Sequence, residues 1–313
     1  MTEGYKALRE GAALADLTGR GYVVLTGEDR ARLLHAMCTQ HVLEMTPGMT
    51  RYAFFLSSQG RILADAHLLC REDSFVLDTE PEAADALAAH LDKYIIADDC
   101  TVENRSAAHT VFAVEGPGAR ELLSNIASED PPEPGRWIRW QAGMLAGIGA
   151  TGQPGWRLFV DRSQAASVEG WLIGAGAITA SAEEVRTVRI ENGRPRFSVD
   201  FGERQIPQET QLLSAVHFSK GCYLGQEIVE RVRSRGQVQR KLAHFTVDAA
   251  TPPEPAAKLT FEGKEVGEIT SAAASPRSGK SAAFGYLRTE VLDKKVAVRV
   301  SGALARSTAN GPA

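Results

Sequence analysis

The segment from Lys220 to Glu227 reads Lys-Gly-Cys-Tyr-Leu-Gly-Gln-Glu and places a cysteine two residues after a lysine. A nearby ammonium favours the thiolate form of a cysteine, so this spacing predicts a reactive or ligand-contacting thiol at Cys222. Gly221 and Gly225 permit tight turns on both sides, which would present the thiol to solvent. A glycine-bounded turn around a buried cysteine is the alternative, and the residues alone leave both open.

Basic residues gather around and after this cysteine. Between Lys220 and Lys241 six basic residues stand against two acidic ones: Lys220, Arg231, Arg233, Arg235, Arg240 and Lys241 against Glu227 and Glu230. In a chain with a formal net charge of −4, this excess suits an anionic ligand or partner, because the planar fork of arginine matches carboxylates and phosphates. A solvated helix face is the alternative. The negative net charge speaks against general nucleic-acid binding.

Two carboxylates lie at positions where a negative charge is unexpected, and a ligand site would account for them. Glu191 falls in the last turn of a predicted helix, where the helix dipole disfavours a negative charge. It could accept two hydrogen bonds from the amide-like edge of a ligand, or it could be an ordinary exposed glutamate. Asp65 interrupts the apolar run from Ile62 to Leu69, and alternation along a strand favours an outward side chain over one aimed at a pocket.

The elements that must position these residues alternate between strands and helices. The first round contains a strand, a helix, a β-hairpin, another strand and a second helix, at 21–26, Glu28–Cys38, 52–56 with 62–70, 74–78 and after Pro81. A second round has strands at 110–115 and 156–160, each followed by a helix. This order predicts an α+β fold with ferredoxin-like units.

Three further segments complete the chain. Ser181 and Glu184 form a capping-box pattern at the start of a helix that stops at Gly193, and the stretch from Arg194 to Ser219 has no clear period. Such a long irregular stretch is more often functional than idle. Beyond 251–255, short alternating runs near 258–261, 265–271, 281–287 and 295–301, with a hairpin turn at 262–264, predict a small all-β barrel or sandwich.

Length and composition bound the class of protein. With 313 residues, 43% of them hydrophobic and 24% charged, the chain can form two or three domains of ordinary globular make-up. No window approaches about 18 consecutive apolar residues. Met1–Arg9 lacks the apolar run of a signal peptide, so a cytoplasmic protein without membrane association is expected. The cysteines form no Cys-x-x-Cys pair, so no metal site is expected, and Cys38, Cys70 and Cys100 are interpreted as small buried hydrophobic residues.

Together these motifs resemble the YgfZ family of folate-binding proteins. The resemblance is carried by Arg189-Ile190-Glu191-x-Gly193-x-Pro195, by Pro207-Gln208-Glu209, and most specifically by the octapeptide Lys220–Glu227. Weaker landmarks follow the expected order at 25–29, 59–65 and 115–119. The YgfZ family includes a mitochondrial iron–sulfur assembly factor and is related to the aminomethyltransferase, or T-protein, of the glycine cleavage system.

The resemblance implies GcvT-like α+β domains around a central cavity that holds tetrahydrofolate, followed by the β-barrel. Residues 1–240 would form the folate-binding region, as two interleaved α+β subdomains that divide near 105–190, and residues 241–313 would form the barrel. The implied function is support for the synthesis or repair of iron–sulfur clusters. The expected partners are a folate derivative and iron–sulfur client or assembly proteins, and the chain itself is expected to be a monomer.

The resemblance also assigns roles to residues. Cys222 is the key residue, with Lys220 and Asp65 as further catalytic candidates. Glu191 corresponds to the pterin-contacting glutamate of the T-protein. The candidate folate contacts beside it are Tyr223, Gln226, Glu227 and Arg231.

One departure separates the two groups of relatives. T-proteins have the pattern Gly-Gly-x-x-Asp-Asp at the hairpin. This chain has Ala64 before Asp65, so one of the paired carboxylates of the transferase is missing. Whether the protein is an enzyme therefore stays open. The alternative function is a folate-dependent one-carbon transferase or demethylase with Asp65 as the base. A third is a thiol enzyme that pairs Cys222 with His217.

Overall fold

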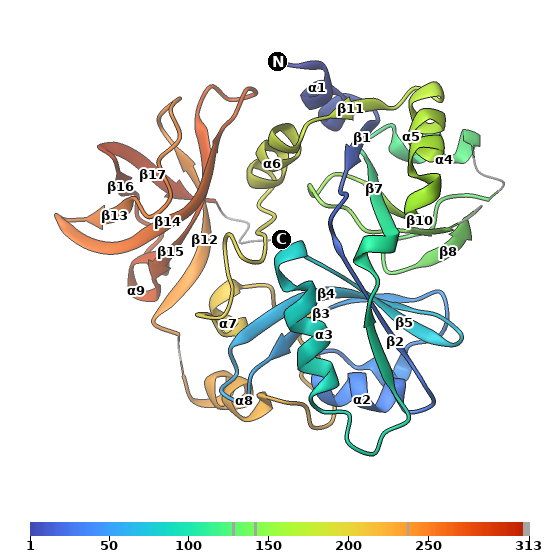
Figure 1. Cartoon of the computed structure of the whole chain (residues 1–313). Coiled ribbons are helices and arrows are strands. Elements are labelled where there is room, and N and C mark those ends of the chain that lie inside the picture. Colours follow the sequence, from blue (N-terminus) through green and yellow to red (C-terminus); the bar gives the residue numbers. More distant parts are fainter. Residues whose placement is uncertain (127–128, 141–142, 237, 309–313) are drawn as a thin grey trace.

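A computed structural model describes residues 1–126, 129–140, 143–236 and 238–308 (Figure 1). The chain builds three bodies: a five-stranded sheet, a six-stranded sheet and a closed barrel. Helix α6 (Ala182–Glu191) lies between the six-stranded sheet and the barrel in Figure 1. The predicted α+β class and the predicted barrel are confirmed.

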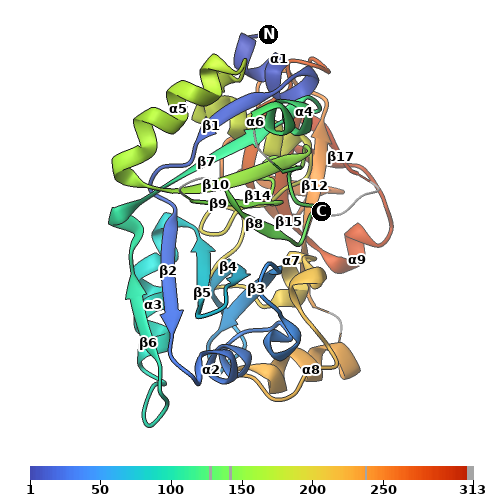
Figure 2. The same cartoon turned by 90° about the vertical axis from the view of Figure 1, so that its right-hand side faces the viewer.

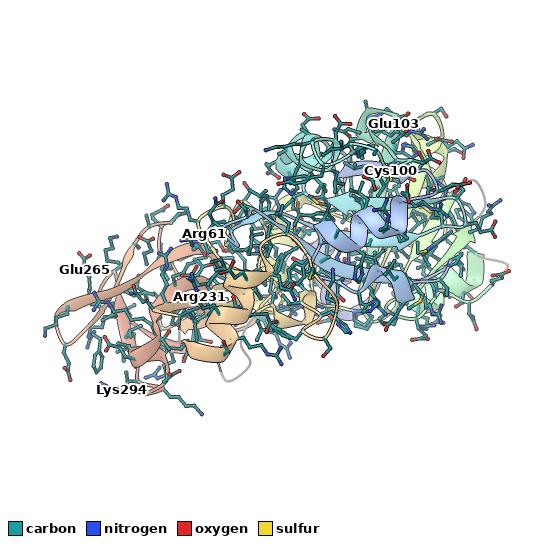
Figure 3. The ribbon with its side chains drawn as sticks, turned by 90° about the horizontal axis from the view of Figure 1, so that it is seen from below. Arg61, Cys100, Glu103, Arg231, Glu265 and Lys294 are labelled. Carbon is teal, nitrogen blue, oxygen red and sulfur yellow. The ribbon has the colours of Figure 1, made fainter. Side chains whose placement is uncertain are left out.

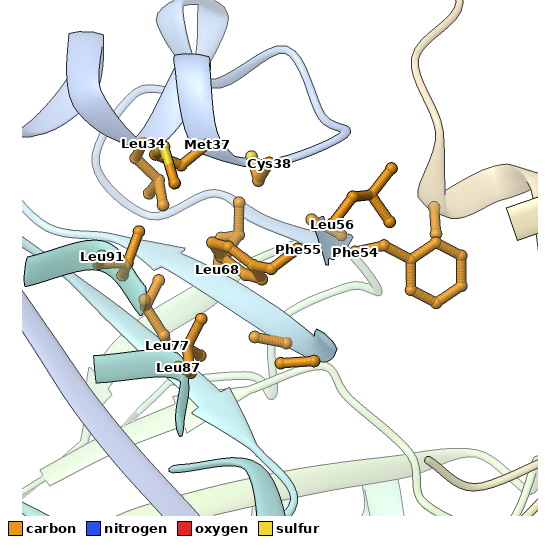
Figure 4. Close-up of a cluster of buried hydrophobic side chains, with 14 of the residues drawn as sticks. Leu34, Met37, Cys38, Phe54, Phe55, Leu56, Leu68, Leu77, Leu87 and Leu91 are labelled. Atoms are coloured by element: carbon orange, nitrogen blue, oxygen red, sulfur yellow. The ribbon is translucent and has the colours of Figure 1, made fainter. Parts of the chain in front are cut away.

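The five-stranded sheet contains the predicted hairpin. Its strands lie in the antiparallel order β3, β4, β5, β2, β6, with the bounds Thr50–Leu56, Ile62–Cys70, Ser74–Thr79, Gly21–Thr26 and Thr101–Asn104. Helices α2 (Arg30–Met37) and α3 (Ala84–Asp92) cover one face and bury a core of leucine, phenylalanine and methionine side chains (Figure 4). Alternate strand positions supply this core, as the periodicity predicts.

The other face of this sheet is also covered. Apolar side chains of the two sheets pack against each other there, among them Tyr22, Leu69 and Val76 against Val111, Met144 and Phe159. Figure 2 shows the six-stranded sheet above the five-stranded one. A side chain that points away from α2 and α3 can therefore be buried as well.

The six-stranded sheet begins with the N-terminus. Its strands lie in the order β11, β1, β7, β10, β9, β8, with the bounds Ile178–Ala180, Ala13–Asp16, His109–Glu115, Gly155–Asp161, Gly143–Ala146 and Trp137–Trp140. Helices α4 (Ala119–Ile126) and α5 (Ala165–Gly174) pack against it. Neither helix α1 (Glu3–Glu10) nor strand β1 was predicted, because β1 is short and its partners β7 and β11 lie far along the chain.

The segment that leads to the barrel follows the predicted pattern. The capping box is present: Ser181 Oγ accepts from the amide of Glu184, and the Glu184 carboxylate accepts from the amide of Ser181. Gly193 ends α6 with a φ of 70°. The irregular stretch after it contains the short helix α7 (Pro207–Thr210) and leads to α8 (Gln226–Arg235).

The C-terminal strands close into a barrel rather than an open sandwich. The order around it is β12, β15, β14, β13, β16, β17, with the bounds Arg240–Val247, Ser281–Arg288, Lys264–Ala274, Lys258–Phe261, Val298–Val300 and Ala303–Ser307, and α9 (Thr289–Leu292) follows β15. Glu262 and Gly263, with φ values of 51° and 77°, form a two-residue turn within the hairpin turn predicted at 262–264, and Lys264 already pairs with Phe261. No helix within the described ranges is long and apolar enough to cross a membrane.

Candidate functional site

A cavity of about 610 Å³ lies where the two sheets meet the segment that leads to the barrel. Its walls come from β4, β5 and β10, from the loop 147–150, from α6 and from residues 194–199. A cavity in this central position is what the resemblance implied. Its volume lies within the usual range of small-molecule pockets.

Asp65 on β4 lines this cavity and is only 8% exposed. The prediction that Asp65 points outward is wrong, because the second sheet covers that face of β4. The hydroxyl of Tyr52 donates a 2.6 Å hydrogen bond to Oδ2 of Asp65, whereas Oδ1 has no partner among the described residues. Burial, reinforced by the charge of Glu80, raises the pKa of Asp65 to about 7. Such a carboxyl group can gain and lose a proton near neutral pH.

A row of ion-paired side chains, in which positive and negative charges alternate, runs along one wall of the cavity and ends at Glu82, just outside the lining. In order, the row joins Arg157, Asp78, Arg20, Glu80, Arg196 and Glu82. The Arg20–Glu80 and Arg196–Glu80 pairs have N–O distances of 2.7 and 3.0 Å. Because each guanidinium group is held by a carboxylate, the wall is preorganised before any ligand enters.

Arginines outnumber carboxylates in the lining. The six arginines are Arg20, Arg157, Arg186, Arg189, Arg194 and Arg196, and the four carboxylates are Asp16, Asp65, Asp78 and Glu80. His67 lies beside them, and burial together with the charge of Arg157 holds its pKa well below the ordinary value, so the ring is neutral. An excess of guanidinium groups in the cavity lining suits a ligand that carries carboxylates.

A glycine-rich loop forms another wall. Gly147–Ala150 lines the cavity, and the buried carboxylate of Glu115 accepts hydrogen bonds from the amides of Ala150 and Thr151 and from the Thr151 hydroxyl. The side chain of Asn192, just after α6, donates to the Thr151 carbonyl oxygen at 2.8 Å. Two different elements thus hold this loop in place.

The cysteine loop lies outside the cavity. Cys222 is exposed, so the open choice between a presented and a buried thiol is decided in favour of presentation, and Tyr223 is the buried residue of this loop. Lys220 is buried, and its Nζ donates to the carbonyl oxygens of His35 and Cys38, the latter at 2.6 Å. No hydrogen bond or ion pair joins Lys220 to Cys222 in the part of the chain that the structure describes.

The side chain of Glu191, at the end of α6, is only 7% exposed, so this residue is not the exposed glutamate of the alternative. Its carboxylate forms an ion pair with Arg9, and its two oxygens share the single proton of the Tyr5 hydroxyl, each at 2.9 Å. Both partners belong to α1, which explains why a negative charge is tolerated at this helix end. Glu191 is not part of the cavity lining, and its contact with a pterin stays a prediction.

The remaining predicted contacts cluster on and before α8. Tyr223 packs in the core of the five-stranded sheet, Gln226 is half-buried, and Glu227 and Arg231 are exposed. The tip of the β3–β4 hairpin packs against α8, and Figure 3 shows Arg61 and Arg231 at this junction. None of the four predicted contacts lines the cavity, so their roles in ligand binding also stay predictions.

The sequence motifs did not reveal most of the cavity wall. Arg20, Arg157 and Tyr52 are single polar residues in or beside apolar strands, where they resemble ordinary surface groups. One signal was available: residues 147–155 contain four glycines, which is typical of a loop that other groups approach closely.

Family models match two parts of the chain. Residues 1–220 match the GCVT N-terminal domain, and residues 240–309 match the glycine cleavage T-protein C-terminal barrel domain. The second match begins where β12 begins.

Individual proteins agree with these matches. A protein of Arabidopsis thaliana that bears the name of a chloroplastic transferase is 26% identical over 295 residues, which cover 92% of this chain and 68% of that one. An aminomethyltransferase of Rubrobacter xylanophilus is 25% identical over 293 residues, 91% of this chain and 78% of that one. The crystal structure of glycine cleavage system aminomethyltransferase T from Bartonella henselae shares the fold, with a TM-score of 0.89 and 20% identity over 99% of this chain and 88% of that one. The chain belongs to the family of the glycine cleavage T-protein, which combines the GCVT N-terminal domain with the T-protein C-terminal barrel domain.

Proposed function

We propose that this protein binds tetrahydrofolate in its central cavity and supports the synthesis or repair of iron–sulfur clusters in client enzymes, as a YgfZ-type member of its family. The observation that carries the proposal is the separation of two parts. Asp65 and the arginines line the cavity, whereas Cys222 is exposed on a loop outside it. An exposed thiol can meet a client protein or an assembly partner, which a thiol inside the cavity could not.

The chemistry of the cavity supports a folate ligand. The arginines suit the carboxylates of its glutamate tail, and Asp65 with Tyr52 offers a polar pair for the nitrogen-rich ring system. Apolar side chains such as Ile148 and Leu212 complete the walls. Polar groups that fix orientation inside a partly apolar cavity are the usual basis of small-molecule specificity.

Calorimetric titration with tetrahydrofolate tests this binding. None of the four tryptophans lines the cavity, so heat is a more direct signal than their fluorescence. Arg186→Met, in the cavity wall, should weaken binding by about tenfold, or 1.4 kcal/mol. Arg288→Met, an exposed arginine on the barrel, should bind like the wild type. Absence of any tetrahydrofolate binding would overturn the proposal.

A complementation experiment tests the accessory role. A strain that lacks the protein should lose activity in its iron–sulfur enzymes, and Cys222→Ser should fail to restore it although it folds and binds folate. Cys100→Ser, which changes a half-buried thiol elsewhere, should restore it. Normal iron–sulfur enzyme activities in the deletion strain would contradict this role.

One observation favours folate-dependent one-carbon transfer or demethylation as a second candidate. Asp65 combines a pKa of about 7 with an Oδ1 that meets no partner among the described residues, as expected of a residue that exchanges a proton with a bound ligand. Its neighbour Ala64 replaces the second carboxylate of the transferases. Incubation with tetrahydrofolate and aminomethyl donors, whose carbon is already at the oxidation level of formaldehyde, should then give methylene-tetrahydrofolate and release ammonia, with Asp65→Asn inactive. No product with any donor would exclude this candidate.

A further inference from the structure

We propose that Lys220 is the positioning residue of the cysteine loop, residues 219–225. In this proposal its ammonium fastens the loop to the carboxyl end of α2 and so fixes Cys222 in space, rather than activating the thiol. The inference rests on the proposed function only for the importance of Cys222. It explains why lysine stands two residues before that cysteine.

The contacts of Lys220 account for its whole ammonium group. Two donors reach the carbonyl oxygens of His35 and Cys38, and Nζ lies 4.8 Å from the centre of the Tyr223 ring. An ammonium has three donors, so two carbonyl oxygens and one aromatic face leave none directed at Cys222. The carbonyl oxygens end a helix, where the dipole favours a positive charge. Lys220 therefore caps α2 from a distant part of the chain.

The rest of the loop is held to the same region. The amide of Leu224 donates to the carbonyl oxygen of Ala36 at 2.9 Å. Gly225 has a φ of 82°, and a Cβ there would lie 2.6 Å from the carbonyl oxygen of Ser57. Lys220 anchors one end and the Leu224 amide anchors the other, next to Gly225, where the hairpin leaves no room for a side chain. Cys222 is an exposed side chain between two fixed points.

The segment before the loop shares this anchor. Leu212 and Ser214 line the central cavity, and the carbonyl oxygen of Ser214 accepts from the side chain of Gln40 at 2.7 Å. Three residues on, the amide of His217 donates to the carbonyl oxygen of Thr39 at 2.8 Å. The end of α2 and the residues just after it therefore hold both part of the cavity wall and the cysteine loop. Loss of Lys220 would free only the part nearest the thiol.

Lys220→Met tests the proposal because methionine keeps much of the length and removes the charge. The first measurement is the iodoacetamide labelling rate of Cys222 against pH, and the second is amide exchange of the loop, both without folate. The anchor predicts a labelling midpoint within about 0.3 pH units of the wild type. It also predicts at least about tenfold faster exchange at Leu224, whose amide donates to the Ala36 carbonyl oxygen, with unchanged exchange in β4 and β12. Lys241→Met, on β12, should change neither.

Two outcomes of these measurements would contradict the proposal. A midpoint raised by about one unit or more, or an unchanged exchange rate in the loop, would overturn the anchor. If Lys220→Met does not fold, Lys220→Arg replaces it: arginine keeps the charge but fits the pocket poorly, so the anchor predicts a loosened loop with an unchanged labelling midpoint. Failure of folate binding would leave these outcomes unaffected, so the two proposals can fail separately.

Discussion

Tyr52 and Asp65 lie on the paired strands β3 and β4, joined by a 2.6 Å hydrogen bond from the phenol to Oδ2 of the carboxyl group. Oδ1 of the same carboxyl group has no partner among the residues described. The pair is therefore half satisfied, and the remaining oxygen is available to a ligand. This arrangement distinguishes Asp65 from Asp78, which two arginines neutralise completely.

Asp65→Asn should stabilise the protein at pH 8 and have little effect near pH 4. The pKa of Asp65 rises from 3.8 to about 7 on folding, so the folded state holds the proton more tightly and loses stability as pH rises between these values. At about 1.4 kcal/mol per pKa unit, the gain at pH 8 is a few kcal/mol. Urea unfolding at both pH values measures it. A difference that does not vary with pH would contradict the assignment.

Asp78→Ala should destabilise the protein by about 3–5 kcal/mol, because it leaves buried guanidinium groups without their counter-charge. Asp78 is fully buried and contacts both Arg20 and Arg157. Glu268→Ala removes an exposed ion pair with Lys258 and should cost less than about 1 kcal/mol. Thermal unfolding of the two variants compares them directly. Equal losses of stability would show that the row of ion-paired side chains along the cavity wall is not tightly packed.

Gly225→Ala should be far more costly than Gly19→Ala. Both glycines have positive φ, at 82° and 100°, so both substitutions carry the backbone penalty of about 1 kcal/mol. A Cβ at Gly225 would also collide with the Ser57 carbonyl oxygen, whereas nothing lies within 4 Å of one at Gly19. The expected cost at Gly225 is therefore above about 3 kcal/mol by chemical denaturation. Comparable losses of stability in the two variants would mean that the β3–β4 hairpin shifts to make room for a side chain at position 225.

His35→Gln should make the protein less sensitive to mild acid. Burial and the charge of Lys220 lower the pKa of His35 from 6.5 to about 4. The folded state therefore resists protonation, and stability is lost as pH falls through this interval. Thermal midpoints at pH 7.5 and 5 should differ less in the variant than in the wild type. Because Asp65 acts in the opposite direction, only the difference between variant and wild type isolates His35.

Local features of the fold could be predicted because short-range chemistry determines them. The capping box joins Ser181 and Glu184, which are only three positions apart at the start of one helix. The turn at Glu262 and Gly263 needs only two neighbouring residues with positive φ. Both are confirmed. The exposure of Cys222 was left open, since it depends on the distant end of α2.

The cavity could not be predicted in the same way because its parts meet over long distances in sequence. Arg157 on β10 finds Asp78 on β5, and Glu115 on β7 finds Thr151 in a loop. Alternation along β4 even gave the wrong direction for Asp65, since a strand pattern cannot tell that a second sheet covers the face. Knowledge of which sheets stack would have been needed first.

Strand β1 has a consequence for how the chain is made. It lies at residues Ala13–Asp16 but pairs with β7 and with β11, which ends at Ala180. During synthesis this strand emerges early and must wait, unpaired, while all of the five-stranded sheet, residues 21–104, is produced before its first partner β7 begins at His109. Such non-local pairing slows folding and leaves an exposed edge meanwhile. The N-terminal region should therefore mature as one unit, because any single cut between Asp16 and His109 would separate β1 from the rest of the six-stranded sheet.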